Sequence, residues 1–299
     1  MAALVCVAAA LLTSCSGAQP SAAPLPPAIG AVRPDAHGAL LYVSDTETGD
    51  VYVFSYPKGV LQQTLTGFTD PAGECVDGNG DVFIANTGGS DVVEYAHGGS
   101  APIATLKDKG YFPVGCSIDP TTGNLAVTND STVSGGQGDL VIYKSAKGTP
   151  KARFTYAAMS QMLLCGYDAA GNLYVDGLTA SNASVFAWKA PHGRLDALTL
   201  DQSIGSAGGV QWDGKHVAIG DQSTNTIYQF SVAKGHGKRV GATQLGGAAM
   251  VFAFWIDATK VIGPDAGAAD VGIWKYPQGG SPVKTIDGVY VPLGAAVSR

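Results

Sequence analysis

The sequence is poor in charged residues, and its positive charges are not clustered. Asp, Glu, Lys and Arg together make up 14% of the 299 residues, and the formal net charge is −6. The 18 Lys and Arg residues are scattered along the chain. A protein that binds nucleic acid carries a basic stripe or patch that faces the phosphates. We therefore expect no nucleic-acid partner.

The sequence also lacks the short motifs of several enzyme classes. It has no Cys-x-x-Cys pair, no Gly-x-Ser-x-Gly elbow and no phosphate-binding loop, which argues against thiol-redox, zinc, serine-hydrolase and nucleotide chemistry. The five His residues are spread out, and no two have metal-ligand spacing. We therefore predict no catalytic residue, no metal ligand and no cofactor, and we expect a binding protein rather than an enzyme.

The apolar run at the N-terminus, Leu4–Leu12, is too short to span a bilayer as a helix. The residues Leu12-Thr13-Ser14-Cys15 end this segment, and they resemble the lipobox of bacterial lipoproteins. The resemblance implies that residues 1–14 are a signal peptide and that Cys15 is the lipid-attachment residue. The alternative is an ordinary secretory signal that is cleaved nearby, in which case Cys15 has no special role.

Residues 16–36 are rich in Ser, Ala and Pro and contain five prolines, which exclude a helix or a central strand. We expect residues 15–38 to be a lipidated tether between the membrane and a folded body at 39–299. The protein is then exported and anchored to the bacterial membrane, on its periplasmic or cell-surface side.

Glycine is abundant, with 41 residues, and much of it lies in a repeated unit. Residues 71–95 contain a short strand ending at Asp77, a Gly-Asn-Gly turn, a second strand ending at Asn86 and a third ending at Tyr95. The middle of the second strand recurs from position 43 to position 263 in five steps that average 44 residues: Val43, Ile84, Val127, Val175, Ile219 and Gly263. The aromatic residue of the third strand has the same period.

A period of about 40–45 residues with several short strands is typical of propeller blades. We predict an all-β, six-bladed β-propeller over residues 39–299, and we expect a monomer. The first unit lacks a first strand, whereas residues 291–298 form a first strand with no partner after it. The C-terminal strand is therefore predicted to join the N-terminal blade and close the ring. A β-sandwich or a parallel β-helix is the alternative fold.

The pattern Pro-x-Gly-x-x-Val-Asp, then Gly-x-x-Phe/Tyr-Val-x-Asp/Asn, resembles NHL-type six-bladed propellers, and the regucalcin/gluconolactonase-like group is similar. The resemblance covers about residues 39–299. Regucalcin-like lactonases hold a divalent metal with an acidic residue and with the middle residues of Pro-Asn-Gly and Pro-Asp-Gly motifs. The matching positions here are Ala72, Val114 and Leu293, which cannot ligate, and Glu74 is offset from the acidic position. A metal-dependent lactonase or hydrolase is therefore the alternative function.

Polar residues that end the second strands are the candidate ligand-binding set: Asp45, Asn86, Asn129, Asp221 and Asp265. In a ring they would gather on one rim, where carboxylates and amides bind a hard cation or a sugar. The alternative is that each caps its own turn. The segment Asn129–Asp139 is expected to be the longest inserted loop, and long loops commonly carry binding sites.

Three cysteines follow Cys15. Cys116 and Cys165 share a register relative to the Asp that closes their strands, whereas Cys75 is one residue later and points the other way. Cys75 and Cys116 are therefore a candidate disulfide between adjacent blades, which an exported location permits. The alternative is that all three are buried as small apolar residues.

These features favour a lipid-anchored cell-envelope propeller that is a binding or scaffold module. Its expected partners are the membrane, through the N-terminal lipid, and an envelope protein, a glycan or a small molecule. A purely structural role in the envelope is a further alternative.

Overall fold

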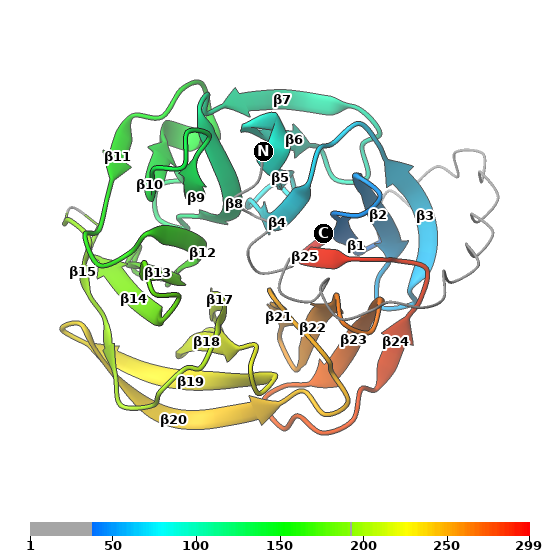
Figure 1. Ribbon diagram of the computed structural model, residues 1–299. Helices are drawn as coiled ribbons and strands as arrows, with labels where there is room; N and C mark the ends of the chain where they lie inside the picture. The colour runs from blue at the N-terminus through cyan, green and yellow to red at the C-terminus, as the bar shows by residue number, and fades with distance from the viewer. Residues whose placement is uncertain (1–37, 192) are drawn as a thin grey trace, which may run out of the picture.

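The computed structural model describes residues 38–191 and 193–299, which form six β-sheets around a central axis (Figure 1). The predicted six-bladed propeller is confirmed. The expected signal peptide, Cys15 and almost all of the expected tether lie outside the described residues. In the part of the chain that is described, no helix is long and apolar enough to cross a membrane.

Each blade is an antiparallel sheet of four main strands, with the inner strand beside the axis. Blades A, B and C are, from the inside outwards, β25 (Pro292–Ser298), β1 (Leu40–Asp45), β2 (Asp50–Ser55), β3 (Val60–Leu65); β4 (Pro71–Val76), β5 (Val82–Asn86), β6 (Asp91–Tyr95), β7 (Pro102–Lys107); and β8 (Tyr111–Ile118), β9 (Leu125–Thr132), β10 (Gln137–Tyr143), β11 (Ala152–Phe154).

Blades D, E and F follow in chain order. Their strands are β12 (Gln161–Tyr167), β13 (Leu173–Leu178), β14 (Ser184–Lys189), β15 (Asp196–Ala197); β17 (Ala207–Trp212), β18 (Val217–Asp221), β19 (Thr226–Ala233), β20 (His236–Gln244); and β21 (Trp255–Asp257), β22 (Lys260–Asp265), β23 (Asp270–Lys275), β24 (Lys284–Ile286). Short 3-10 turns occur at η2 (Thr87–Gly89) and η3 (Lys144–Ala146).

The two ends of the chain share blade A. The C-terminal strand β25 pairs with β1 in antiparallel register, with Leu40 opposite Ser298 and Val43 opposite Ala295. Figure 1 shows β25 between β1 and the axis. The His97 ring, from blade B, lies 2.7 Å from Ser298 Oγ through Nδ1 and 3.1 Å from the Gly38 carbonyl through Nε2. The predicted closure by the C-terminal strand is therefore confirmed.

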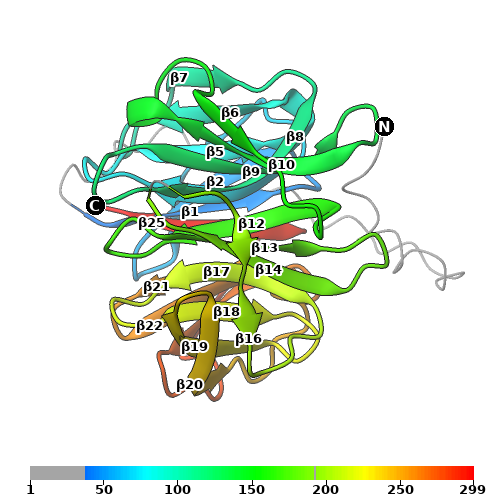
Figure 2. The same ribbon diagram turned by 90° about the vertical axis from the view of Figure 1, so that its left-hand side faces the viewer.

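The core lies between the blades. Successive side chains of a strand point to opposite faces, and both faces of each blade are apolar because each meets a neighbouring blade. Six of the seven clusters of buried apolar residues lie between adjacent blades. Between blades A and B, for example, Tyr42 and Val53 pack with Ile84 and Val93. The side view shows neighbouring blades face to face (Figure 2).

The propeller has two different ends. We call the end that carries the turns between inner and second strands the inner-turn face. The opposite end, where the second strands finish and the chain enters each inner strand, is the rim face. Because Leu40 pairs with Ser298 at the inner-turn face, the chain enters the propeller at Gly38 on that face.

Two features differ from the expectations. The segment expected as an inserted loop, Asn129–Asp139, is mostly strand, because β9 and β10 extend as a hairpin with only residues 133–136 between them. Blade E also has a fifth strand, β16 (Thr199–Leu200), which pairs in parallel with β20. Its two residues carry no repeat signal, so the spacing did not predict it.

We expect deletion of residues 288–299 to remove most of the free energy of unfolding, which is about 5–15 kcal/mol in natural proteins. The deletion removes β25, and no other strand replaces it. One edge of β1 is then left unpaired beside the axis. Deletion of residues 16–36 is the matched control and should leave the melting temperature unchanged. Equal melting temperatures for the two deletions would contradict the closure.

Candidate functional site

The acidic residues predicted for the rim bind the backbone of their own blades. Asp221 accepts hydrogen bonds from the N–H groups of Gly205 and Ser206, just before β17, and from Ser223 in the next turn, at 3.0–3.1 Å. Asp265 accepts from Ala249 and Met250 in the same way, at 2.7 and 2.8 Å. Asp45 repeats the pattern with Tyr290, Val291, Glu47 and Thr48.

The two Asn side chains of the predicted set also form hydrogen bonds with neighbouring segments. Asn86 Oδ1 accepts from the Thr69 N–H at 2.7 Å, and its Nδ2 donates to Asp91 at 2.9 Å. Asn129 Nδ2 donates to Asp108 and Asp139 at 2.8 and 2.7 Å. In all five blades the side chain joins the incoming segment or the next turn to the end of the second strand. These are the hydrogen bonds of turn capping, although Asn129 Oδ1 is buried with no partner among the described residues, and ligand binding by the five side chains stays a prediction.

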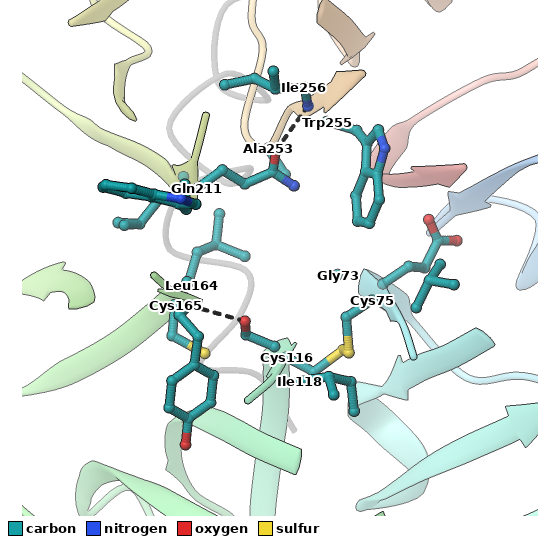
Figure 3. Close-up of a pocket in the computed structure, with 18 of the residues that line it drawn as sticks. Gly73, Cys75, Cys116, Ile118, Leu164, Cys165, Gln211, Ala253, Trp255 and Ile256 are labelled. Atoms are coloured by element: carbon teal, nitrogen blue, oxygen red, sulfur yellow. Dashed lines mark hydrogen bonds between the residues drawn. A yellow bond between two sulfur atoms is a disulfide. The ribbon is translucent and has the colours of Figure 1, made fainter. Parts of the chain in front are cut away.

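A cavity of ≈350 Å³ lies on the axis between the inner strands (Figure 3). Its lining includes turn residues Pro120, Asp168 and Ala169, so it opens on the inner-turn face, opposite the five capping residues. The lining comes from all six inner strands. We take this axial cavity as the candidate functional site.

An apolar plug lies on the axis between this cavity and the rim face. It contains one residue from each blade, in the first half of the inner strand or, for Phe252, just before it: Ala72, Val114, Leu163, Ala207, Phe252 and Leu293. Three of these are the positions that match metal-binding motifs of regucalcin-like lactonases, and here they serve as core. Among residues 38–191 and 193–299, no group of three or more His, Cys, Asp or Glu is placed to hold a metal ion.

Polar side chains on the inner strands bind the next blade across the cavity wall. Gln211 Oε1 accepts the N–H of Ile256 at 2.7 Å, and Ser117 Oγ accepts that of Tyr167 at 3.0 Å. Figure 3 shows the first of these hydrogen bonds as a dashed line, with Gln211 reaching from blade E towards Ile256 of blade F. These bonds satisfy N–H groups on edges that have no strand partner.

A second set of bridges comes from the second strands, one residue before the capping position. Ser44 Oγ accepts the Gly294 N–H of its own blade at 2.9 Å and donates to the Ala72 carbonyl of blade B. Thr128 Oγ1 donates to the Leu163 carbonyl of blade D at 2.6 Å. Each side chain thus links neighbouring inner strands on the rim-face side of the cavity.

Asp176 occupies the same position in blade D and is fully buried. Its carboxylate accepts the N–H of Leu164 at 2.6 Å and that of Gly209, in blade E, at 2.9 Å. Burial raises the pKa of Asp176 to about 7, and the two backbone donors offset only part of that effect. Asp176 was not predicted, although an Asp inside a strand that is otherwise apolar was the signal for it.

Cys75 and Cys116 are joined by a disulfide at the cavity wall, with an S–S distance of 2.15 Å (Figure 3). The bond links blades B and C and closes a loop of 41 residues. Chain entropy gives such a cross-link a stabilisation of about 4 kcal/mol. Cys165 is a free, buried thiol whose pKa is raised by burial.

Glu74 lies on the inner strand of blade B and is 8% exposed. Both carboxyl oxygens are buried, with no hydrogen-bond partner among the described residues. Burial therefore raises the pKa of Glu74 well above its ordinary value, which favours the neutral acid.

Aromatic side chains line the mouth of the cavity, and the sequence analysis did not identify them. Tyr167, Trp212 and Trp255 come from blades D, E and F, and all three are partly exposed. Tyr167 and Trp212 directly precede the Asp that closes their strands, where the other copies have Val or Ile. Large aromatic residues at that repeat position were the available signal.

The comparisons with known proteins show the fold. No family of known sequences matches the chain, and no curated protein does. The chain is similar to a solved structure of a nidogen/laminin complex, with a TM-score of 0.71 and 13% identity over 88% of this chain and 99% of that one.

Two bacterial structures of unknown function are also similar. One is from Bacteroides caccae, with a TM-score of 0.65 and 11% identity over 88% of this chain and 99% of that one. The other is from Desulfotomaculum acetoxidans, with a TM-score of 0.61 and 10% identity over 87% and 99%. At these identities the likeness concerns the propeller fold and not the site.

We expect Asp176→Asn to flatten the dependence of stability on pH between about 4 and about 7. In that range folded Asp176 holds a proton that the unfolded chain releases near 3.8, so the wild-type free energy of unfolding falls as pH rises, by at most about 4 kcal/mol. Urea denaturation at several pH values measures the slope. Glu74 is present in both proteins and does not affect the comparison.

Asp213→Asn is the control for this experiment. Hydrogen bonds to the Asp213 carboxylate lower its pKa below 3.8. The contribution of Asp213 to the free energy of unfolding is therefore lost only at acidic pH and is constant between about pH 5 and pH 7. Between about pH 5 and pH 7, the free energy of unfolding of Asp213→Asn should change with pH as steeply as that of wild type. Parallel curves for wild type and Asp176→Asn would contradict the assignment.

Proposed function

We propose that this protein is an exported binding module that holds a small molecule, or the end of a larger one, in the axial cavity. The observation that carries the proposal is a cavity that opens on the inner-turn face, with an apolar plug between it and the rim face and with aromatic and polar side chains in its lining. Its ≈350 Å³ lies within the roughly 300–1,000 Å³ of ligand sites. The NHL-type repeat pattern is in keeping with a binding role.

The proposal includes a lipid anchor at Cys15 in the bacterial envelope. The support is the lipobox-like sequence and the Ser-, Ala- and Pro-rich segment after it. Gly38, where the described chain begins, lies on the inner-turn face together with the cavity mouth. The residues from 15 to 38 span at most about 80 Å, so an anchored propeller would keep this mouth within that distance of the membrane.

We expect Ile118→Trp to abolish ligand retention. Ile118 lines the cavity, is partly exposed and also packs against the core between blades B and C, so a larger side chain at this position distorts and narrows the cavity wall. Purified full-length protein is incubated with a small-molecule extract of the envelope, and the retained molecules are measured by mass spectrometry. The variant should retain at least about tenfold less, because overfilling of a packed site excludes its ligand.

Ile103→Trp is the matched control, since Ile103 is 55% exposed on the outer strand β7. It should retain the same molecules as wild type, and circular dichroism should show that both variants keep the β-sheet fold. Retention by Ile118→Trp equal to that of wild type would place binding outside the cavity.

We expect Cys15→Ser to release the protein from the membrane fraction into the soluble envelope fraction. A thioether-linked diacylglycerol anchors a protein firmly because each buried CH₂ contributes about 0.8 kcal/mol. Cys6→Ser, within the expected signal peptide, is the control and should remain membrane-bound. Unchanged fractionation of Cys15→Ser would refute the anchor.

A further inference from the structure

We infer that the ligand of the axial cavity is an uncharged sugar ring, either a free hexose or the terminal residue of a glycan. This inference rests on the proposed function and adds the chemical class of the ligand.

The described lining of the cavity offers a ligand no free charge. It contains no Lys, Arg or His, and its acidic groups are Glu74 and Asp168. The Glu74 carboxyl oxygens are buried and its neutral form is favoured. The Asp168 carboxylate is already bound by the N–H groups of Ala170 and Asn172, both at 2.9 Å, by Asn172 Nδ2 and by the Tyr174 hydroxyl. An anionic ligand would lose hydration there without gaining a counter-charge, and a cationic ligand would meet only Asp168, whose oxygens neutral donors already occupy.

The lining instead includes partly exposed aromatic side chains from three consecutive blades, Tyr167, Trp212 and Trp255, each of which also packs against the core between two blades. The face of an aromatic ring carries partial negative charge. The C–H groups on one face of a pyranose ring carry partial positive charge and form a flat apolar patch. Stacking of this kind suits a sugar and does not need an ionic group.

Unused donors surround these rings. Within the part of the chain that the structure describes, the indole N–H groups of Trp212 and Trp255 and the Gln211 amide nitrogen have no acceptor, and none is sealed from solvent. An indole N–H only donates, and a Gln Nε2 only donates. A ligand with acceptor oxygens can use these donors, and sugar hydroxyls present such oxygens on every side of the ring.

The size of the cavity fits one ring. A volume of ≈350 Å³ corresponds to about twelve water-sized volumes. A hexose has about the same number of non-hydrogen atoms. Further residues of a glycan would have to extend from the mouth on the inner-turn face.

The test is a panel of sugars against the purified full-length protein. Saturation-transfer NMR and isothermal titration calorimetry are run with D-glucose, D-galactose, D-mannose and N-acetyl-D-glucosamine, and with the ionic analogues D-glucosamine and D-glucuronate. We expect at least one neutral sugar to bind at least tenfold more tightly than both ionic analogues. Methyl glycosides and β-linked disaccharides of the same sugar then distinguish a free hexose from a glycan end.

Gln211→Glu is the decisive variant. It keeps the Oε1 acceptor for the Ile256 N–H, so the wall stays intact, but it replaces the amide donor with a carboxylate. Neutral sugars should bind at least tenfold more weakly, and the preference should shift towards D-glucosamine. Trp255→Phe keeps an aromatic ring and loses the N–H, so it should weaken binding about threefold to tenfold. Trp188→Phe, on the outer part of blade D, should bind as wild type.

Two results would overturn the inference. One is tighter binding of an ionic analogue than of every neutral sugar. The other is no binding of any sugar in the panel by wild type. If Ile118→Trp still blocks retention of some other molecule, the proposed function stands and only the ligand class fails; if it blocks nothing, the proposed function fails too.

Discussion

The inner strand of every blade pairs along one edge only, and this constraint shapes the centre of the molecule. Its other edge faces the axis, where backbone N–H and C=O groups have no ladder partner. Side chains supply the missing partners: Ser44, Thr128 and Asp176 from the second strands, and Ser117 and Gln211 from the inner strands themselves. Because each bridge ends on the neighbouring blade, the same bonds that satisfy the edges also hold the ring together.

The site depends on this arrangement. Gln211 is at once a bridge to Ile256 and part of the cavity wall, so the position of its free amide nitrogen is set by a structural bond. The disulfide between Cys75 and Cys116 fixes the wall between blades B and C, and the apolar plug closes the rim-face end. The cavity is therefore preorganised, which lowers the entropic cost of binding.

The fold could be predicted because its signals are local. The Asp and Gly residues of the turns and the aromatic residue of each third strand lie within one repeat, and the opposite register of Cys75 and Cys116 follows from strand alternation. The cavity could not be predicted, because Trp212 and Trp255 reach one cavity only when blades E and F pack together. The residues that end the second strands looked like a site in sequence, yet the Asp221 carboxylate, for example, accepts hydrogen bonds from the incoming segment of its own blade. Local patterns locate turns, whereas a site between blades depends on how the blades pack.

The break in the polypeptide lies where the other five blades have the turn between inner and second strands. Ser298 pairs with Leu40, and His97 contacts both Ser298 and Gly38, so the two ends are held as if they were joined. A linker of a few residues there would create a sixth such turn, and the chain could then be opened at another one, such as 78–80, with every blade retained. The molecule is in this sense suited to circular permutation. The ring fixes the order of the blades, but it does not fix the turn at which the chain begins and ends.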